Sequence, residues 1–364
     1  MSKKVLFVAN QVKDRSPAQR FRFEQYFKYL TQQGYECELA HLLTGDEAKT
    51  FYSKGKAAAK AWIVIKSFFR RYRQCARADN YDIVFIQREA FITGTIFFEK
   101  MLRRSKAKMI FDFDDAVWLD SVSDINRRFA FLKNPDKTAA LIKMADQVIA
   151  GNAYLAGYAR MFNPHVIIIP TTIDTEEYKP EGEKDHDNPV IIGWSGSFST
   201  IQHFKYALPV LKKLQATFGN RILIKVIGDA GYKNEELNLV SLGWNKNDEL
   251  KELNSFHIGI MPLPDDEWSK GKCGLKGLQY MALGIPTIMS PVGVNKKIIQ
   301  DGENGFLASD TNEWVNKLSM LIESKELRET IGREGRNTVV SRFSVEANKN
   351  LYLKYFNQVI EKSS

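Results

Sequence analysis

The sequence contains few cysteines and no long apolar run. Three of its 364 residues are cysteines, and Cys37, Cys75 and Cys273 do not stand at the spacing of a metal or redox site. An odd number of cysteines argues against a disulfide framework and favours a reducing, cytoplasmic setting. No run of about 18 apolar residues occurs, so no membrane-spanning helix is predicted. The apolar run at residues 5–9 is too short for a signal peptide and is interpreted as a first buried strand.

The Gly-x-Gly-x-x-Gly pattern of a dinucleotide site is also absent after the first predicted strand of either half of the chain. The first strand continues into "NQVKDRSPAQR", and the strand near residue 190 continues into "WSGSFST". The glycines of that pattern let the backbone approach a pyrophosphate, so a nicotinamide cofactor is not expected. We expect no bound cofactor and no metal ion.

Acidic residues are in the minority, and the excess of basic residues lies in the first half of the chain. The sequence has 52 Lys and Arg against 43 Asp and Glu, which gives a formal net charge of +9. A basic half suggests contact with nucleic acid, anionic lipid or a phosphate-bearing substrate. No motif that reads nucleic acid is present, so we do not expect a nucleic-acid partner.

Short apolar runs alternate with longer amphipathic segments along most of the chain. Runs such as "KVLFVAN", "DIVFIQ", "KMIFDFDD" and "VIIGWSG" predict strands, and segments of helical length such as "AQRFRFEQYFKYLTQQG" separate them. Near-continuous apolar strands joined by helices predict parallel sheets that are covered on both faces. The length suits two domains. We therefore expect an α/β protein with two Rossmann-like, doubly wound domains that face each other across a cleft, the natural place for an active site.

The predicted domain boundaries follow a break in this pattern. The stretch "PEGEKDHDNP" is polar, charged and bracketed by prolines, which is typical of a linker. We predict a first domain at residues 1–178, a linker at 179–188 and a second domain at 189–342. Residues 343–364 predict a terminal helix that would pack back on the first domain.

The stretch "GKCGLKGLQYMALGIPTIMS", residues 271–290, predicts a glycine-bearing loop, a helix and a buried strand. A helix N-terminus offers unpaired N–H groups and partial positive charge, and so favours phosphate. Lys272 and Lys276 flank the helix start, where the helix dipole disfavours cations, which a bound anion would explain. Gly271 and Gly274 would let backbone approach that anion closely, Leu275 is assigned to the same donor-binding set, and Gln279 would reach a sugar hydroxyl. The alternative is an ordinary helix–strand unit with solvated lysines.

The run "HIGIMPLPDDEWSKGKCGLKGLQYMALGIPTIMSPVGVNKKIIQDGENGFLASDTNEW" resembles the donor-binding region of glycosyltransferase family 4, which has the GT-B fold. Its parts follow the family's order: a strand ending in Pro-Leu, a loop, a glycine-opened helix, "M-A-x-G-x-P", "P-V-G" and "D-G-x-N-G-F". The segments "PTTIDTEEYKP", "VIIGWSGS" and "REGRNTVVSRFS" also match. The resemblance implies transfer of a sugar from a UDP- or GDP-sugar with retention of configuration, with the diphosphate at a helix N-terminus of the second domain.

Two departures from the family pattern concern charge. The family usually has two glutamates eight residues apart, and here those places hold Gly271 and Gln279. Gln279 would still hydrogen-bond a ribose hydroxyl, as donor or acceptor. A carboxylate from the preceding loop, such as Asp266, would replace the first glutamate.

The second departure is in the loop after the first strand of the second domain. The family commonly has an arginine and a lysine there, whereas this loop offers Gly196 and Ser197 and no cation before His203. Neutralisation of the diphosphate would then depend on Lys272 and Lys276. In its form "K-C-G-x-K-x-L-Q-Y-M" the sequence resembles a subgroup of the family, the bacterial polysaccharide transferases.

In the first domain, candidate residues follow the predicted strands. Asp114 and Asp115 in "IFDFDDAVW" would position the sugar or the acceptor, or else cap a helix. The motif Asp112-Phe113-Asp114 resembles the metal motif of a different glycosyltransferase fold, which the two-domain pattern disfavours. Arg20, Arg22 and Arg88 would face an acceptor phosphate or the donor sugar, unless they are simply solvated.

Residues 54–77, "KGKAAAKAWIVIKSFFRRYRQCAR", contain eight Lys or Arg, no acidic residue and several aromatic residues. A basic helix with aromatic anchors is typical of a membrane-surface element, and would bring the protein to anionic lipid on the inner face of the plasma membrane. The alternative is a sheet-covering helix whose apolar stripe is core.

These observations favour a membrane-associated glycosyltransferase that acts on a cell-envelope polysaccharide or a lipid-linked acceptor. A sugar-nucleotide epimerase or hydrolase and a non-catalytic regulator with the same fold remain alternatives. The non-catalytic regulator is kept as an alternative because Gly271 stands where the family has its first glutamate.

Overall fold

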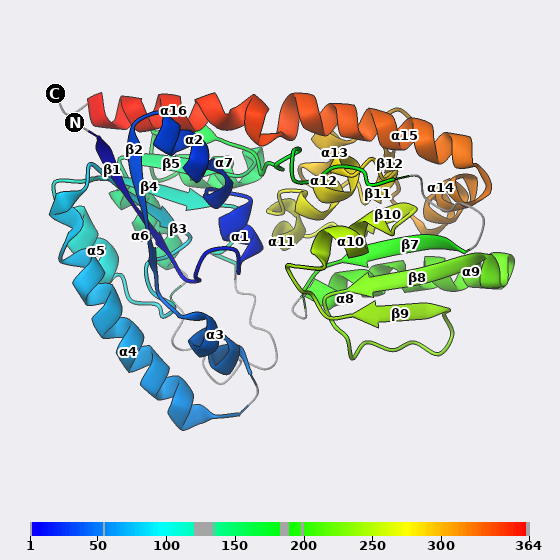
Figure 1. Cartoon of the computed structure of the whole chain (residues 1–364), viewed down its shortest axis with the longest axis horizontal. Coiled ribbons are helices and arrows are strands. Elements are labelled where there is room, and N and C mark those ends of the chain that lie inside the picture. Colours follow the sequence, from blue (N-terminus) through cyan, green and yellow to red (C-terminus); the bar gives the residue numbers. More distant parts are fainter. Residues whose placement is uncertain are drawn as a thin grey trace. The chain divides into compact units, whose positions relative to one another are not determined.

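The computed structural model of the chain describes residues 2–53, 55–119, 134, 136–182, 189–197 and 200–361. These residues form two compact units, the first from 1–171 with 348–364 and the second from 172–347. Each unit is built on a six-stranded sheet whose neighbouring strands all pair in parallel (Figure 1). The predicted α/β class with two doubly wound, Rossmann-like sheets is confirmed.

The sheet of the first unit has the strand order β2-β1-β3-β4-β5-β6. Its strands are β1 (Lys3–Ala9), β2 (Tyr35–His41), β3 (Ile83–Gln87), β4 (Lys108–Phe113), β5 (Gln147–Ala150) and β6 (Val166–Ile168). Its helices are α1 (Pro17–Arg20), α2 (Phe27–Gln32), α3 (Gly45–Tyr52), α4 (Ala57–Cys75), α5 (Phe97–Arg103), α6 (Asp136–Met144) and α7 (Ala153–Arg160), with most of α16 (Val345–Glu361).

Strand position explains the sequence of each strand in this unit. All residues of β3 are buried, as expected for a central strand of a parallel sheet with helices on both faces. Strand β2 lies at the edge of the sheet, and it contains several exposed and partly exposed residues, Glu36 and Glu38 among them. The continuous apolar runs of the sequence therefore mark the central strands.

An aromatic cluster joins the last helix to the core of the first unit. The ring of Phe7 on β1 lies 5.1 Å from that of Phe23, 5.1 Å from that of Phe85 and 6.3 Å from that of Phe356 on α16. The hydroxyl of Tyr352, also on α16, donates a hydrogen bond to the carbonyl oxygen of Arg22. Residues from Asn348 onward therefore group with the first unit, although they follow the second in sequence.

The sheet of the second unit has the order β12-β11-β10-β7-β8-β9. Its strands are β7 (Val190–Ser195), β8 (Ile222–Ile227), β9 (Leu239–Leu242), β10 (Ile258–Met261), β11 (Thr287–Met289) and β12 (Phe306–Leu307). Its helices are α8 (Ile201–Phe204), α9 (Leu208–Phe218), α10 (Glu249–Asn254), α11 (Glu267–Lys270), α12 (Leu275–Ala282), α13 (Asn295–Ile298), α14 (Thr311–Glu323) and α15 (Lys325–Thr338), followed by a π-helical turn at Val339–Phe343.

The second unit begins earlier than the linker predicted from the sequence. The backbone N–H of Ile173 donates to the carbonyl oxygen of Phe343 over 2.8 Å, and Ile173 and Ser344 form an isolated parallel bridge. These bonds place residues 172–178, assigned to the first domain by the sequence, in the second unit. Within the predicted linker, residues 183–188 lie outside the described part of the chain.

In each sheet the strand order reverses beside the first strand. The chain runs from β1 to β2 on one side and resumes with β3 on the other, and it runs from β7 through β8 and β9 before β10 resumes on the opposite side. Loops leave the carboxyl edge in opposite directions at such a switch point, and ligands of open α/β sheets bind there. The fold therefore marks the edge at β1 and β3, and the edge at β7 and β10, as the places to examine.

Candidate functional site

Directly after β7, position 196 has room for glycine only. A Cβ atom at Gly196 would lie 2.2 Å from the ring of Trp194 and 2.7 Å from Oγ1 of Thr200. The backbone N–H of Ser197 donates to that same Oγ1 over 2.8 Å. A Cβ at Gly228, at the end of β8, would lie 2.5 Å from the carbonyl oxygen of Gly196. The predicted donor residues Gly196 and Ser197 thus lie in close packing at the switch point of the second unit.

Helix α12 begins at the neighbouring strand end. Gly274 caps it with a φ of 72°, in the left-handed region that favours glycine, and a Cβ there would lie 2.3 Å from Cδ1 of Ile298. The first intrahelical bond is donated by Leu278, so the N–H groups of residues 275–277 precede it at the helix start. Close packing fixes the helix, since a Cβ at Gly277 would lie 1.8 Å from Cε of Met289. The predicted phosphate-binding end is a rigid feature of the fold.

The two lysines of this region lie over indole rings. Nζ of Lys272 is 4.7 Å from the ring centroid of Trp268, and Nζ of Lys276 is 5.6 Å from that of Trp194. An ammonium group over an indole face is attracted by the ring quadrupole by about 0.5–2 kcal/mol. Lys276 and the loop after β7 therefore converge through Trp194, which brings the two predicted halves of the donor site together.

Gln279, one turn into α12, is buried and its amide nitrogen is fully engaged. Nε2 donates to the hydroxyl of Tyr178 over 3.2 Å and to Oε1 of Glu249 over 3.4 Å. The Tyr178 hydroxyl in turn donates to Oε2 of Glu249 over 3.1 Å, and Nε1 of Trp244 donates to Oε1 of Glu249 over 3.1 Å. Both amide protons of Gln279 are used, and in the described part of the chain its Oε1 accepts no hydrogen bond. Gln279 offers a ligand an acceptor only.

The loop between β10 and α12 uses its carboxylates locally. Asp266, predicted to contact the donor sugar, caps α11 by accepting a hydrogen bond from the N–H of Ser269 over 2.7 Å. Glu267 and Asp265 both lie near Lys270, at 2.7 and 3.9 Å from its Nζ. A cap of this kind orients the loop, and it is the helix-capping role that Asp residues prefer.

At the switch point of the first unit, Arg88 bridges two carboxylates. Its Nε is 2.7 Å from Oδ1 of Asp114 and its Nη2 is 3.2 Å from Oδ2 of Asp115. Arg88 has a φ of 63°, which non-glycine residues adopt only at a cost of about 1–3 kcal/mol. Its N–H donates to the carbonyl oxygen of Asp112 over 2.8 Å. Three of the predicted residues therefore form one cluster, and strain of this kind is typical of functional sites.

Arg22 and Asp112 form a second ion pair directly beneath this cluster. Both side chains are fully buried, with Nε of Arg22 3.2 Å from Oδ2 of Asp112 and Nη2 2.5 Å from Oδ1. Nη1 of Arg22 donates to the carbonyl oxygen of Ile169 over 2.6 Å. Burial raises the pKa of the Asp112 carboxyl, and the neighbouring Arg22 opposes that rise. Arg22 thus ties the ends of β4 and β6 together from the interior, not from the surface of a ligand site.

Arg20 and the Asp-x-Asp motif also take positions that the sequence alone does not give. Arg20 is buried, with its guanidinium carbon 4.9 Å from the ring centroid of Phe21. In the motif, Asp112 points inward to Arg22, whereas Asp114 points to Arg88. Residues two apart in a strand share a face, but β4 ends at Phe113, so Asp114 lies in the following loop and is free of that alternation.

Two residues of the second unit were missed by reasoning from sequence. Glu249 and Tyr178 are 30 and 101 positions from Gln279, and nothing in their local pattern marks a contact with it. Glu249 lies in the first turn of α10, where an acidic residue has an ordinary explanation in the helix dipole. Only the tertiary fold brings these groups together.

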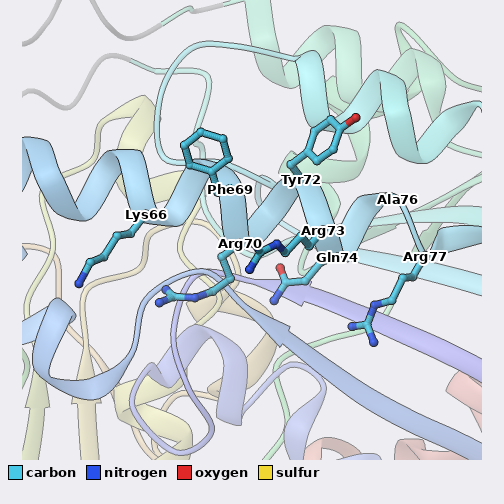
Figure 2. Close-up of a pocket in the computed structure, with 8 residues that line it drawn as sticks. All are labelled: Lys66, Phe69, Arg70, Tyr72, Arg73, Gln74, Ala76 and Arg77. Atoms are coloured by element: carbon cyan, nitrogen blue, oxygen red, sulfur yellow. The ribbon is translucent and has the colours of Figure 1, made fainter.

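The predicted basic helix is α4, and Lys54 lies outside the described residues. Its buried side chains are Ile63, Ser67, Arg71 and Cys75, while the aromatic residues face outward. A hollow of about 890 Å³ runs along it, and Figure 2 shows the rings of Phe69 and Tyr72 on one side with Lys66, Arg70 and Arg77 extending away from them. Among the described residues, no helix is long and apolar enough to cross a bilayer.

Comparison with known proteins gives the family of the second unit. Residues 189–324 match the family described as glycosyl transferases group 1. A sulfoquinovosyl transferase of Arabidopsis thaliana, SQD2, is 26% identical over 213 residues, which cover 52% of this chain and 38% of that protein's length. The region that carries the predicted donor site, with α12 and the loop after β7, lies inside the matched family segment.

Solved structures extend the likeness to the whole chain. Sucrose-phosphate synthase from Thermosynechococcus elongatus matches with a TM-score of 0.71 and 13% identity, covering 100% of both chains. HepE from Anabaena, in complex with UDP and glucose, matches with a TM-score of 0.67 and 15% identity, covering 98% of this chain and 100% of that one. This chain therefore has the GT-B fold, and its residues 189–324 match the glycosyl transferases group 1 family, in agreement with the resemblance to glycosyltransferase family 4.

Proposed function

We propose that this protein transfers a sugar from a nucleotide diphosphate donor to a cell-envelope polysaccharide or a lipid-linked acceptor, with retention of anomeric configuration. The observation that carries the proposal is the start of α12. A glycine-capped helix N-terminus, with Lys272 and Lys276 beside it, lies at the switch point of the sheet within the segment that matches the transferase family. The N–H groups and the dipole of such a helix start favour phosphate.

The proposed donor is a UDP- or GDP-sugar. HepE, which shares the fold, is described in complex with UDP-glucose. In this chain the diphosphate would contact the N–H groups at Leu275 and Lys276, with the ammonium groups of the two lysines adding charge. Gly196 and Ser197 would let backbone approach the same phosphates, and Oε1 of Gln279 would accept a hydrogen bond from a ribose hydroxyl.

We assign the acceptor or the transferred sugar to the strand ends of the first unit. Asp114 and Asp115 are held by Arg88, and each carboxylate is about one-seventh exposed, so part of each remains accessible to a hydroxyl group. In the proposed reaction the acceptor oxygen bonds to the anomeric carbon as the bond from that carbon to the phosphate oxygen breaks. The proton of the acceptor hydroxyl passes to a donor phosphate oxygen, and the two carboxylates orient the reacting groups.

A panel of radiolabelled UDP- and GDP-sugars, each incubated with the protein and a membrane extract, tests this proposal. We expect one donor to label lipid or polysaccharide, and Asp114→Asn with Asp115→Asn to lower labelling at least about a hundredfold. Release of free sugar or of an epimerised nucleotide without labelled acceptor would favour the hydrolase or epimerase alternative. Nucleotide binding without turnover of any donor would favour a regulator.

A further inference from the structure

Large apolar side chains are exposed together on α4 and α5. Six of the thirteen such side chains in the described part of the chain lie there, Trp62, Ile65, Phe68, Phe69 and Tyr72 on α4 and Phe97 on α5. They are 38–60% exposed, and Phe68 packs against both Phe69 and Phe97, with ring centroids 6.0 Å apart in each case. Large apolar side chains gathered in this way on the exposed face of neighbouring helices mark an interaction surface. We name these six residues the aromatic ridge.

The aromatic ridge is not needed to hold α4 on the unit. The helix is fixed through its opposite side, where Ile63, Ser67, Arg71 and Cys75 recur every four residues and are buried. The guanidinium of Arg71 donates to the carbonyl oxygens of Ala40 and Ala9 over 2.8 and 2.7 Å, at the ends of β2 and β1. The alternative in which the apolar stripe is core therefore accounts for one face of the helix and leaves the ridge unexplained.

A row of cations runs beside the aromatic ridge. Lys66, Arg70, Arg73 and Arg77 line the hollow along α4 together with Phe69 and Tyr72 (Figure 2). Arg70 and Arg77 are paired with Glu47 and Glu38, at 2.8 and 3.1 Å. The helix itself carries no acidic residue, and Lys66 lies 5.8 Å from the ring centroid of Trp62. An apolar face bordered by cations is complementary to an anionic, partly apolar partner.

We infer that the aromatic ridge and its cation row dock the first unit on an anionic bilayer surface. The rings would enter the interface between headgroups and acyl chains, while Lys66 and Arg73 would lie against lipid phosphates in the hollow. A second copy of the chain on this face would set two cation rows against one another, which disfavours a symmetric dimer. This surface is separate from the strand-end and α12 residues to which we assign the transfer reaction.

Flotation with vesicles tests the inference on the full chain. Vesicles of phosphatidylcholine with about one-third phosphatidylglycerol should carry the wild-type protein upward, and pure phosphatidylcholine should carry at least about fivefold less. Trp62→Ser with Phe69→Ser should abolish flotation, and Lys66→Gln with Arg73→Gln should remove the preference for anionic vesicles. The matched control is Tyr206→Ser with Met320→Ser, which removes two exposed apolar side chains elsewhere and should float as the wild type does.

Two further measurements keep the result decisive. Thermal unfolding and UDP or GDP calorimetry of the ridge variant should match the wild type, so that a loss of flotation cannot come from misfolding. Failure of the wild type to bind any vesicle overturns the inference and leaves the proposed transfer reaction untouched. A concentration-dependent dimer in analytical ultracentrifugation that the ridge variant lacks would also overturn it, in favour of a protein partner.

The clamp around Gln279 carries a second, independent proposal, which rests on the proposed donor site. We infer that Glu249 is a positioning residue that fixes the orientation of the Gln279 amide. Rotation of the amide by half a turn would set Oε1 of Gln279 against the Glu249 carboxylate, 3.4 Å away in the present orientation. The clamped amide presents only its carbonyl to the ribose, as a carboxylate would. Where the family has a glutamate, this chain has Gln279, and Glu249 on α10 fixes which end of its amide faces the ligand.

A double-mutant cycle tests this positioning role. Gln279→Glu should weaken binding of the preferred nucleotide at least about fivefold, since it sets two carboxylates side by side, and adding Glu249→Gln should recover part of the loss. The wild type should bind the 2′-deoxy or 3′-deoxy nucleotide more weakly than the parent nucleotide, whereas Gln279→Met should not discriminate. Additive effects or retained discrimination would overturn the proposal, while absence of any nucleotide binding by the wild type would instead overturn the donor site.

Discussion

The two sheets reverse their strand order at equivalent places, yet different chemistry fills the two switch points. In the first unit, charges meet charges: Arg22 pairs with Asp112 in the interior and Arg88 bridges Asp114 and Asp115 above it. In the second unit, backbone and aromatic rings dominate, with glycines at 196 and 274 and lysines over the indoles of Trp194 and Trp268. Cations over rings can turn to an incoming phosphate at small cost, whereas paired charges keep their geometry.

The comparison predicts that the two units respond to different kinds of substitution. The first should lose stability when a charge partner is removed, because a buried charge without its partner is costly. The second should lose ligand affinity when a glycine gains a side chain or a lysine loses its ammonium group. The following predictions run from the largest expected effect to the smallest.

Removal of the buried carboxylate should have the largest effect. Asp112→Ala leaves the Arg22 guanidinium buried without its main partner, so we expect the free energy of unfolding to fall by about 3–5 kcal/mol. Urea unfolding measures this loss. The matched control is Glu36→Ala, which breaks the exposed pair with Lys4 and should cost less than about 1 kcal/mol. Similar costs for the two variants would contradict the comparison.

The glycine cap of α12 should come next. Gly274→Ala places a Cβ at a φ of 72° and 2.3 Å from Ile298, and should cost about 1–3 kcal/mol of stability with a loss of nucleotide affinity. Gly302→Ala is the control, because Gly302 has a φ of 80° but no atom within 4 Å of the added Cβ. Equal effects of the two substitutions on affinity, measured by calorimetry, would show that the helix start is not the ligand site.

The lysines of the second unit should affect binding more than folding. Lys272→Ala and Lys276→Ala should each weaken UDP or GDP binding at least about tenfold, while the midpoint of thermal unfolding changes little. Lys270→Ala is the control, because Lys270 lies only two residues before Lys272 and pairs with Glu267. If Lys272→Ala and Lys276→Ala bind nucleotide as tightly as the wild type, the diphosphate assignment is wrong.

The smallest expected effect is on the loss of stability of the first unit as the pH falls. Hydrogen bonds from Arg70, with further ones from Thr44, hold the pKa of Glu47 down at about 2, although burial opposes the shift. A carboxylate whose pKa is lowered on folding stabilises the protein above its ordinary value of 4.5, and this stability is lost as pH falls toward 2. Glu47→Gln should therefore show a shallower loss of stability between pH 4.5 and 2 in urea unfolding. An unchanged slope would contradict the role given to the Glu47–Arg70 pair.

Much of the fold was predictable because its signals are local. Buried parallel strands such as β3 and β10 are continuous apolar runs, and the helix start at Gly274 follows from glycine placement. The family segment was also recognisable, since its motifs recur in order along the chain. Backbone requirements and close packing can be recognised in short stretches of sequence.

The parts that were not predictable depend on distant partners. Arg22 was predicted to face an acceptor phosphate or the donor sugar, because its partner Asp112 is 90 positions away and only the sheet brings them together. Arg88 adopts a left-handed φ, which the sequence does not indicate because the residue is not a glycine. Glu249 reaches Gln279 only through the packing of α10 near α12. Side-chain chemistry at a switch point is a tertiary property, even where the switch point itself is a property of strand order.

The buried arginine of α4 has a mechanical consequence. Arg71 bonds the end of β1 at Ala9 and the end of β2 at Ala40, and a further bond to Gln74 braces it within its own helix. A load applied along α4 would therefore reach the last residue of β1, after which the loop toward Arg20 begins. A surface that binds α4 would also stiffen that loop. Binding to the surface and the transfer reaction would then be coupled through Arg71.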